Sequence, residues 1–275
     1  MKFKIISFSI LSCVWITLVS CSDYQKLLNS DDVPEKYKQA EVFYNNGEYR
    51  KANRLLEQIL PTYRGKPQAQ RVIFFFADSY FQTRSYNLAA YQYESFVKSY
   101  PKSERVQEAT FKAAKSYYHQ SPSYSLDQED TYKAIEKLQI FINLYPNSQY
   151  NPEANQMISE LQEKLEKKDF EIAKQYFTIR DFRAAIKAND NFIANFPGTK
   201  FREEALYTKF LSLYEIAINS IFSKKEKRLK ELQEQYNLIL RYYPETLFLV
   251  DLDNKMKKVN SELEEFKTTT TTLSK

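Results

Sequence analysis

The side chains with the greatest potential for chemistry in this 275-residue chain are two cysteines and one histidine. Cys13 lies within an apolar N-terminal stretch, Cys21 directly follows that stretch, and His119 comes after two tyrosines in a helical pattern. So few of these residues cannot form the clusters that hold zinc. A histidine near a helix end is also more typical of a surface or turn residue than of a catalytic base. We therefore expect no metal, no cofactor and no enzyme active site.

The glycine content and the charge exclude two further classes of function. Three glycines in the whole chain are too few for the glycine-rich turns that bring phosphate close to the backbone. Without residues 1–20, which carry two of the 40 basic residues, 38 basic and 35 acidic residues remain, a net charge of +3. A nucleic-acid partner needs a clustered basic face. The one basic run, residues 224–230, suits a solvated helix face or, alternatively, contact with anionic lipid or an acidic partner.

The N-terminus has the parts of a secretory signal: two lysines, an apolar run over residues 5–19, and a small residue before Cys21. That run is shorter than the ~20 apolar residues of a membrane-spanning helix. Residues 18–21, Leu-Val-Ser-Cys, resemble the lipobox of bacterial lipoproteins. The resemblance implies that residues 1–20 are removed and that lipidation of Cys21 anchors the protein, with residues 21–32 as a tether. The alternative is an ordinary signal peptide with an incidental cysteine.

An internal repeat organises the rest of the chain. Four segments place an apolar residue five positions before a proline and an aromatic residue directly before it, and they end at Pro101, Pro146, Pro197 and Pro244. These prolines are 45, 51 and 47 residues apart, and a serine or threonine follows each by two positions. Proline stops one helix, and the hydroxyl can cap the next. Because apolar residues recur every three or four positions, we predict an all-α chain of helix pairs.

Small and aromatic residues recur at fixed positions inside these units. The pattern of Ala40, Phe43 and Ala52 returns at positions 77, 80 and 89 and again at 173, 176 and 185. It resembles the tetratricopeptide repeat, which implies a solenoid of about five helix-turn-helix units. Pro61 and Asn189 depart from the pattern, and the fifth unit has no clear pair of small residues. The expected domains are repeats 1–3 (33–147, with a loop insert at about 120–130), repeats 4–5 with a C-terminal helix (148–266), and a disordered tail (267–275).

A lipoprotein of this length with five such repeats resembles the BamD family, the lipoprotein subunit of the outer-membrane β-barrel assembly machine. The match is best at residues 145–150, 172–178 and 196–199, and the repeat-three insert is also similar. The resemblance implies a non-enzymatic scaffold on the periplasmic face of the outer membrane. It also implies that the N-terminal repeats receive unfolded outer-membrane proteins and that the later ones dock the barrel-forming subunit. The alternatives are another envelope repeat lipoprotein acting as an adaptor, or an enzyme that uses the repeats as a scaffold.

Repeat geometry places the first helix of each unit on the concave side of a solenoid, where peptides bind. Each of the residues expected to line this groove could equally belong to the core. Phe75 and Phe76 are expected to pack between helices instead. The candidate groove residues are Tyr37, Glu41, Tyr44, Asn45, Phe74, Asp78, Phe81 and Gln82.

Overall fold

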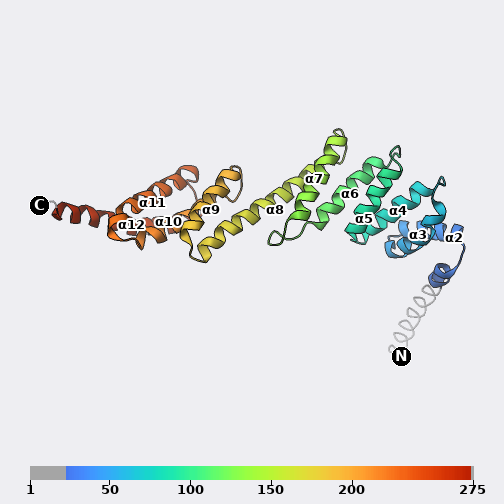
Figure 1. Cartoon of the computed structure of the whole chain (residues 1–275), viewed down its shortest axis with the longest axis horizontal. Coiled ribbons are helices and arrows are strands. Elements are labelled where there is room, and N and C mark those ends of the chain that lie inside the picture. Colours follow the sequence, from blue (N-terminus) through green and yellow to red (C-terminus); the bar gives the residue numbers. More distant parts are fainter. Residues whose placement is uncertain (1–22, 274–275) are drawn as a thin grey trace, which may run out of the picture. The chain divides into compact units, whose positions relative to one another are not determined.

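The computed structural model describes residues 23–273, so the expected signal peptide (1–20) and Cys21 lie outside the described residues. All regular secondary structure in the described range is helical, and helices adjacent in sequence pack against one another (Figure 1). The all-α prediction is therefore confirmed. The helices are α2 (Val33–Asn45), α3 (Tyr49–Tyr63), α4 (Ala69–Gln82), α5 (Tyr86–Ser99), α6 (Val106–Gln120), α7 (Glu129–Leu144), α8 (Asn151–Thr178), α9 (Phe182–Asn195), α10 (Arg202–Ile218), α11 (Phe222–Tyr242) and α12 (Leu249–Leu273).

The proline segments are the turns between successive helix pairs. The aromatic residue before each proline closes the preceding helix; at Tyr100, for example, the backbone N–H donates to the Phe96 carbonyl oxygen at 2.9 Å. Ser103 and its equivalents then accept a hydrogen bond from the N–H two residues later, at 3.2 to 3.3 Å. The hydroxyl thus shapes the turn just before the helix starts, and does not act as the N-cap residue itself.

The turn inside a repeat has a different and equally regular form. Gly47, Arg84 and Arg180 end the first helices of repeats 1, 2 and 4, with φ angles of 78°, 62° and 64°. A left-handed residue at this position is a common way to end a helix, and glycine adopts it without steric cost. In repeat 4 the next helix is capped by Asp181, whose carboxylate accepts from the Ala184 N–H at 3.1 Å.

The alanines of the repeat pattern lie at the closest helix contacts. Ala40, Ala52, Ala77, Ala89 and Ala185 are fully buried, and the first four belong to the apolar core of unit 1. Asn189, which interrupts the pattern, is also fully buried; its amide donates to the Ala185 carbonyl oxygen at 2.8 Å, and its Oδ1 has no partner in the described residues. The polar side chain therefore occupies a core position that other repeats fill with a large apolar residue.

The described chain forms two compact units. Unit 1 contains the residues up to Pro122 and residues 127–161, and unit 2 contains residues 123–126 and those from 162 onward. The boundary falls inside α8, whereas the sequence analysis placed it between residues 147 and 148. The loop between α6 and α7 spans residues 121–128, within the range expected for the insert. Its tip belongs to unit 2, where the Leu126 carbonyl oxygen accepts from Lys168 at 2.5 Å.

Two segments expected to lack structure are helical. Residues 23–29 form helix, and Tyr24, Leu27 and Leu28 pack against the core of unit 1, because their spacing of three and four puts them on one face. At the other end α12 continues to Leu273, into the expected tail, since that stretch contains no proline or glycine to stop it. The tether and the tail are therefore both shorter than the sequence analysis expected.

Candidate peptide-binding surface

The candidate groove residues lie on α2 and α4, the first helices of repeats 1 and 2, within unit 1. Asn45 and Gln82 are exposed, whereas Tyr37, Glu41, Tyr44 and Phe81 are partly buried. Burial and a hydrogen bond to Glu41 raise the pKa of Tyr37 to about 12, so its hydroxyl is a neutral donor. These six residues offer polar and aromatic surface, and their use in binding stays a prediction.

Phe74 belongs to the core, which corrects its assignment to the groove. Its side chain is buried, and its ring makes edge contacts with Tyr93 and Phe96 of α5 at centroid distances of 5.8 and 5.6 Å. Phe75 and Phe76 are buried in the core of unit 1, as expected, and Phe75 packs between α4 and α2, where its ring stacks on Tyr44 at 4.1 Å and 9°.

Asp78 is also buried, but it is the centre of a polar network. Its carboxylate accepts from the hydroxyls of Tyr44 at 2.7 Å and Tyr93 at 2.6 Å, from the Lys112 ammonium at 2.6 Å and from the Gln82 amide at 3.3 Å. The network joins α2, α4, α5 and α6. Asp78 therefore holds three successive repeats in register rather than presenting a carboxylate to a ligand.

The ionisation of this network follows from its contacts. Burial alone would raise the pKa of Asp78, but the Lys112 charge and the hydrogen bonds outweigh it and leave the pKa below its ordinary value. The pKa of Lys112 is raised, because the Asp78 charge outweighs the opposing effect of burial. Burial, followed by the bond to Asp78, raises the pKa of Tyr44 far above 10. At neutral pH Lys112 therefore pairs with Asp78 and, at 3.1 Å, with Glu108, and the two tyrosine hydroxyls are neutral donors.

Cations flank the Tyr44–Phe75 stack. Arg71 lies 5.2 Å from the Phe75 ring centroid and pairs with Glu41 at 2.9 Å, and Arg105 at the start of α6 lies 5.8 Å from the same ring. Both arginines are exposed, so their guanidinium groups remain open to a ligand. We name these four residues, Tyr44, Phe75, Arg71 and Arg105, the aromatic–arginine surface. Phe75 itself is buried, at 7% exposure, so a ligand would meet the Tyr44 ring and the two guanidinium groups. Arg71 and Arg105 were not predicted from the sequence; the signal available was arginine on or beside the first helices of repeats 2 and 3.

His119 is a surface residue at the end of α6. Its ring stacks on Tyr86 at 4.5 Å and 18° and meets the edge of Phe81 at 5.8 Å. Burial, together with the nearby Lys115 and Arg84 charges, lowers its pKa, so the ring is neutral at pH 7. Within residues 23–273 no group of three or more histidine, cysteine or acidic side chains could hold a metal ion.

Comparison with known proteins decides the family. A family model described as YfiO, outer membrane lipoprotein, matches residues 29–188 and 175–272. The chain belongs to the YfiO/BamD family. Among curated proteins, the outer membrane protein assembly factor BamD of Helicobacter pylori (strain ATCC 700392 / 26695) is 23% identical over 132 residues. That match covers 45% of this chain and 60% of the relative's length.

Family membership confirms the prediction that this chain is an outer membrane lipoprotein of the BamD family. The YfiO/BamD family consists of non-enzymatic outer membrane lipoproteins and includes an outer membrane protein assembly factor. Among the helices of residues 23–273, none combines the length and the apolar character needed to cross a membrane. Membership in this family therefore identifies the chain as an outer membrane lipoprotein built on helical repeats.

Proposed function

We propose that this protein is a lipid-anchored subunit of the outer-membrane protein assembly machinery. It scaffolds the barrel-forming subunit and receives unfolded outer-membrane proteins before their insertion. The observation that carries the proposal is the aromatic–arginine surface of unit 1, where Arg71 and Arg105 flank the stacked rings of Tyr44 and Phe75. Such a surface suits an extended peptide with alternating aromatic residues and a terminal carboxylate, because rings and cations recognise both features.

Unit 2 is proposed to dock the barrel-forming subunit. Its last inter-repeat turn exposes three large apolar side chains: Tyr242 at 53%, Leu247 at 92% and Val250 at 74% exposure. Leu247 and Val250 are three positions apart where α12 begins. An exposed apolar cluster of this kind favours a protein partner. Because repeat proteins depend mainly on contacts between neighbours, each unit can hold its own surface.

The substrate half of the proposal is tested with a peptide of alternating aromatic residues that ends in phenylalanine. Replacing Arg71 and Arg105 together by glutamine should weaken binding by about 1–2 kcal/mol, as measured by fluorescence anisotropy. Lys98→Gln is the control, since Lys98 is an exposed cation on α5, whereas the surface is formed by α2, α4 and the start of α6. Equal affinities for all three proteins would refute the assignment of this surface.

The partner half is tested by copurification from membranes in mild detergent. The wild-type protein and the Arg71/Arg105 variant should both retain the barrel-forming subunit, whereas Leu247→Ser with Val250→Ser should lose it. Both serine substitutions lie at exposed positions, so circular dichroism should be unchanged. If the wild-type protein retains no barrel-assembly subunit, the assembly role fails, and an adaptor role for another envelope complex becomes the better account.

A further inference from the structure

The helical residues 23–29 bring the proposed lipid anchor close to one edge of repeat 1. Only Ser22 separates Cys21 from Asp23, and two residues span about 7 Å at most. Tyr24 is fixed to the repeat: its hydroxyl donates to the Lys51 carbonyl oxygen at 3.2 Å, and its ring meets Phe43 edge-on at 5.4 Å. If Cys21 carries the lipid, as the proposed function requires, the surface around Tyr24 lies at the membrane.

A buried lysine completes this attachment. Lys36 of α2 is only 7% exposed, and its ammonium donates to the Leu28 carbonyl oxygen at 3.0 Å and to the Gln58 side chain at 2.7 Å. It therefore satisfies a carbonyl at the end of the 23–29 helix, where no backbone N–H is available. Apolar packing of Leu27 and Leu28 against the unit 1 core holds the same segment. The position of residue 23 relative to repeat 1 is thus well defined.

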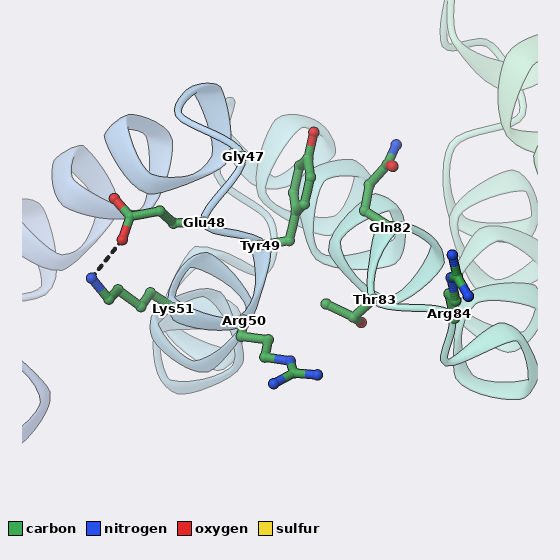
Figure 2. Close-up of a pocket in the computed structure, with 8 residues that line it drawn as sticks. All are labelled: Gly47, Glu48, Tyr49, Arg50, Lys51, Gln82, Thr83 and Arg84. Atoms are coloured by element: carbon green, nitrogen blue, oxygen red, sulfur yellow. Dashed lines mark hydrogen bonds and ion pairs between the residues drawn. The ribbon is translucent and has the colours of Figure 1, made fainter.

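Lys51, which holds Tyr24, also lines an open pocket of about 460 Å³ between the inner turns of repeats 1 and 2. Figure 2 shows Arg50 extending from the first turn, away from the Glu48–Lys51 ion pair, while Arg84 comes from the second turn with Thr83 beside it. The pocket and Tyr24 share Lys51, so the first turn of α3 lies beside the 23–29 segment. A second pocket, lined by Asp23, Tyr24 and Leu27 among others, lies at that segment itself.

This edge carries a local excess of positive charge. Arg50, Arg54 and Arg84 are exposed, and none of them forms an ion pair within the described residues; we call these three arginines the basic edge. Arg54 is close enough to Tyr24 to act on its pKa. The nearby acidic groups are already neutralised, Asp23 by Lys26 at 3.2 Å and Glu48 by Lys51. Glu57 is exposed one helix turn from Arg54 on α3, so three arginines against this one acid leave the basic edge a net charge of +2.

We propose that the basic edge binds the headgroups of anionic phospholipids and so fixes how repeat 1 lies on the membrane that its lipid enters. Phosphate oxygens match guanidinium groups as bidentate acceptors, and cations near an anionic surface each add to binding. The acyl chains supply the anchoring, while the basic edge sets the orientation. The proposal rests on Cys21 as the lipid-bearing residue and is independent of the protein partners.

The full mature chain with Cys21→Ser tests the basic edge without the acyl chains. It should sediment with vesicles of phosphatidylglycerol and phosphatidylcholine and remain free with phosphatidylcholine alone. Arg50→Gln with Arg84→Gln should weaken the binding on the order of tenfold. Added salt should weaken it for the parent chain much more than for this variant.

Repeat 4 provides a matched control. Arg180 and Arg183 occupy the equivalent inner turn of unit 2, and Arg180 has the same left-handed φ as Arg84. Arg180→Gln with Arg183→Gln should leave vesicle binding unchanged. An equal loss for this control pair, or equal binding to neutral vesicles, would overturn the basic edge as the lipid contact. Circular dichroism checks that both variants keep their helices.

The acylated protein gives the orientation directly. A fluorophore at Asn87→Cys, next to the Arg84 turn, should be quenched by a lipid-soluble quencher in anionic vesicles, and one at Lys98→Cys, near the other end of α5, should not. Equal quenching at both positions would contradict a fixed orientation. Mass measurement of the N-terminal peptide is made on the same sample, so a missing lipid at Cys21 is recognised separately. Copurification of the barrel-forming subunit tests the proposed function independently of these results.

Discussion

Tyr44 on α2 and Asp78 on α4 are joined by a 2.7 Å hydrogen bond across 34 positions of sequence, in a network where Asp78 is almost completely buried. Tyr44→Phe should keep the stack on Phe75 but leave the carboxylate with one donor fewer. We expect a loss of about 1–3 kcal/mol in the free energy of unfolding, measured with urea. Tyr91→Phe, at a residue 66% exposed, is the control and should be neutral. A Tyr44→Phe protein as stable as wild type would refute the structural role of the network.

The same network should set the pH range of stability. The pKa of Asp78 is lowered on folding, so its contribution is present above about 4 and is lost as pH falls through the folded-state value. The pKa values of Tyr44, Tyr93 and Lys112 are raised, so their contributions are present below about 10 and are lost as pH rises further. Urea melts at several pH values should show both losses. In Asp78→Asn the acid-side loss should be smaller than in wild type.

Asn189 should be a site where a single substitution stabilises unit 2. Its Oδ1 is buried without a partner, and Leu56 and Leu138 are fully buried apolar residues at the matching positions of other repeats. Asn189→Leu should raise the free energy of unfolding by about 1 kcal/mol or more, because it removes an unsatisfied polar atom. Asn189→Ala, which removes the amide but leaves a cavity, should gain less. Thermal unfolding of the three proteins tests this order.

The left-handed turn residues provide a paired test of backbone strain. A Cβ on Gly47 would meet nothing within 4 Å, so Gly47→Ala should cost about 1–2 kcal/mol through its φ of 78° and not through crowding. Arg84→Gly, at the same turn position, should relieve strain of the same kind and be neutral or stabilising. In urea unfolding we expect Gly47→Ala to lower the free energy of unfolding and Arg84→Gly to leave it unchanged or raise it. A lower free energy of unfolding for both variants would argue against the shared turn geometry.

The anchor itself is tested by Cys21→Ser. The substitution should abolish lipidation and allow a high-salt wash to release the protein from the membrane fraction, because acyl chains supply stable anchoring, whereas a peripheral electrostatic contact is weakened by salt. Fractionation and the mass of the N-terminal peptide provide the measurement. An unchanged membrane fraction with no lipid mass on the wild-type peptide would mean that Cys21 is not the anchor.

The repeat positions could be predicted from sequence because alanine spacing and proline turns are local signals. Phe74 could not be assigned in the same way: in a run of three consecutive phenylalanines the local pattern does not say which ring turns outward, and contacts with Tyr93 and Phe96 of α5 put Phe74 in the core. The Asp78 network depends on partners 15 and 34 positions away, which no local pattern indicates. The helical segment at residues 23–29 was missed because its apolar face is only three residues long.

The helical segment at residues 23–29 shortens the connection between repeat 1 and the proposed lipid anchor at Cys21. A flexible tether over residues 22–32, as expected from the sequence, would let repeat 1 range over roughly 18 Å from its lipid. With residues 23–29 packed on the core and Cys21 as the proposed lipid-bearing residue, repeat 1 can lie at most about 7 Å of chain from its lipid. Such a short connection would confine repeat 1 to a thin layer at the bilayer and raise its effective concentration toward anything else held there. Encounters with membrane-bound partners would then be a search in two dimensions.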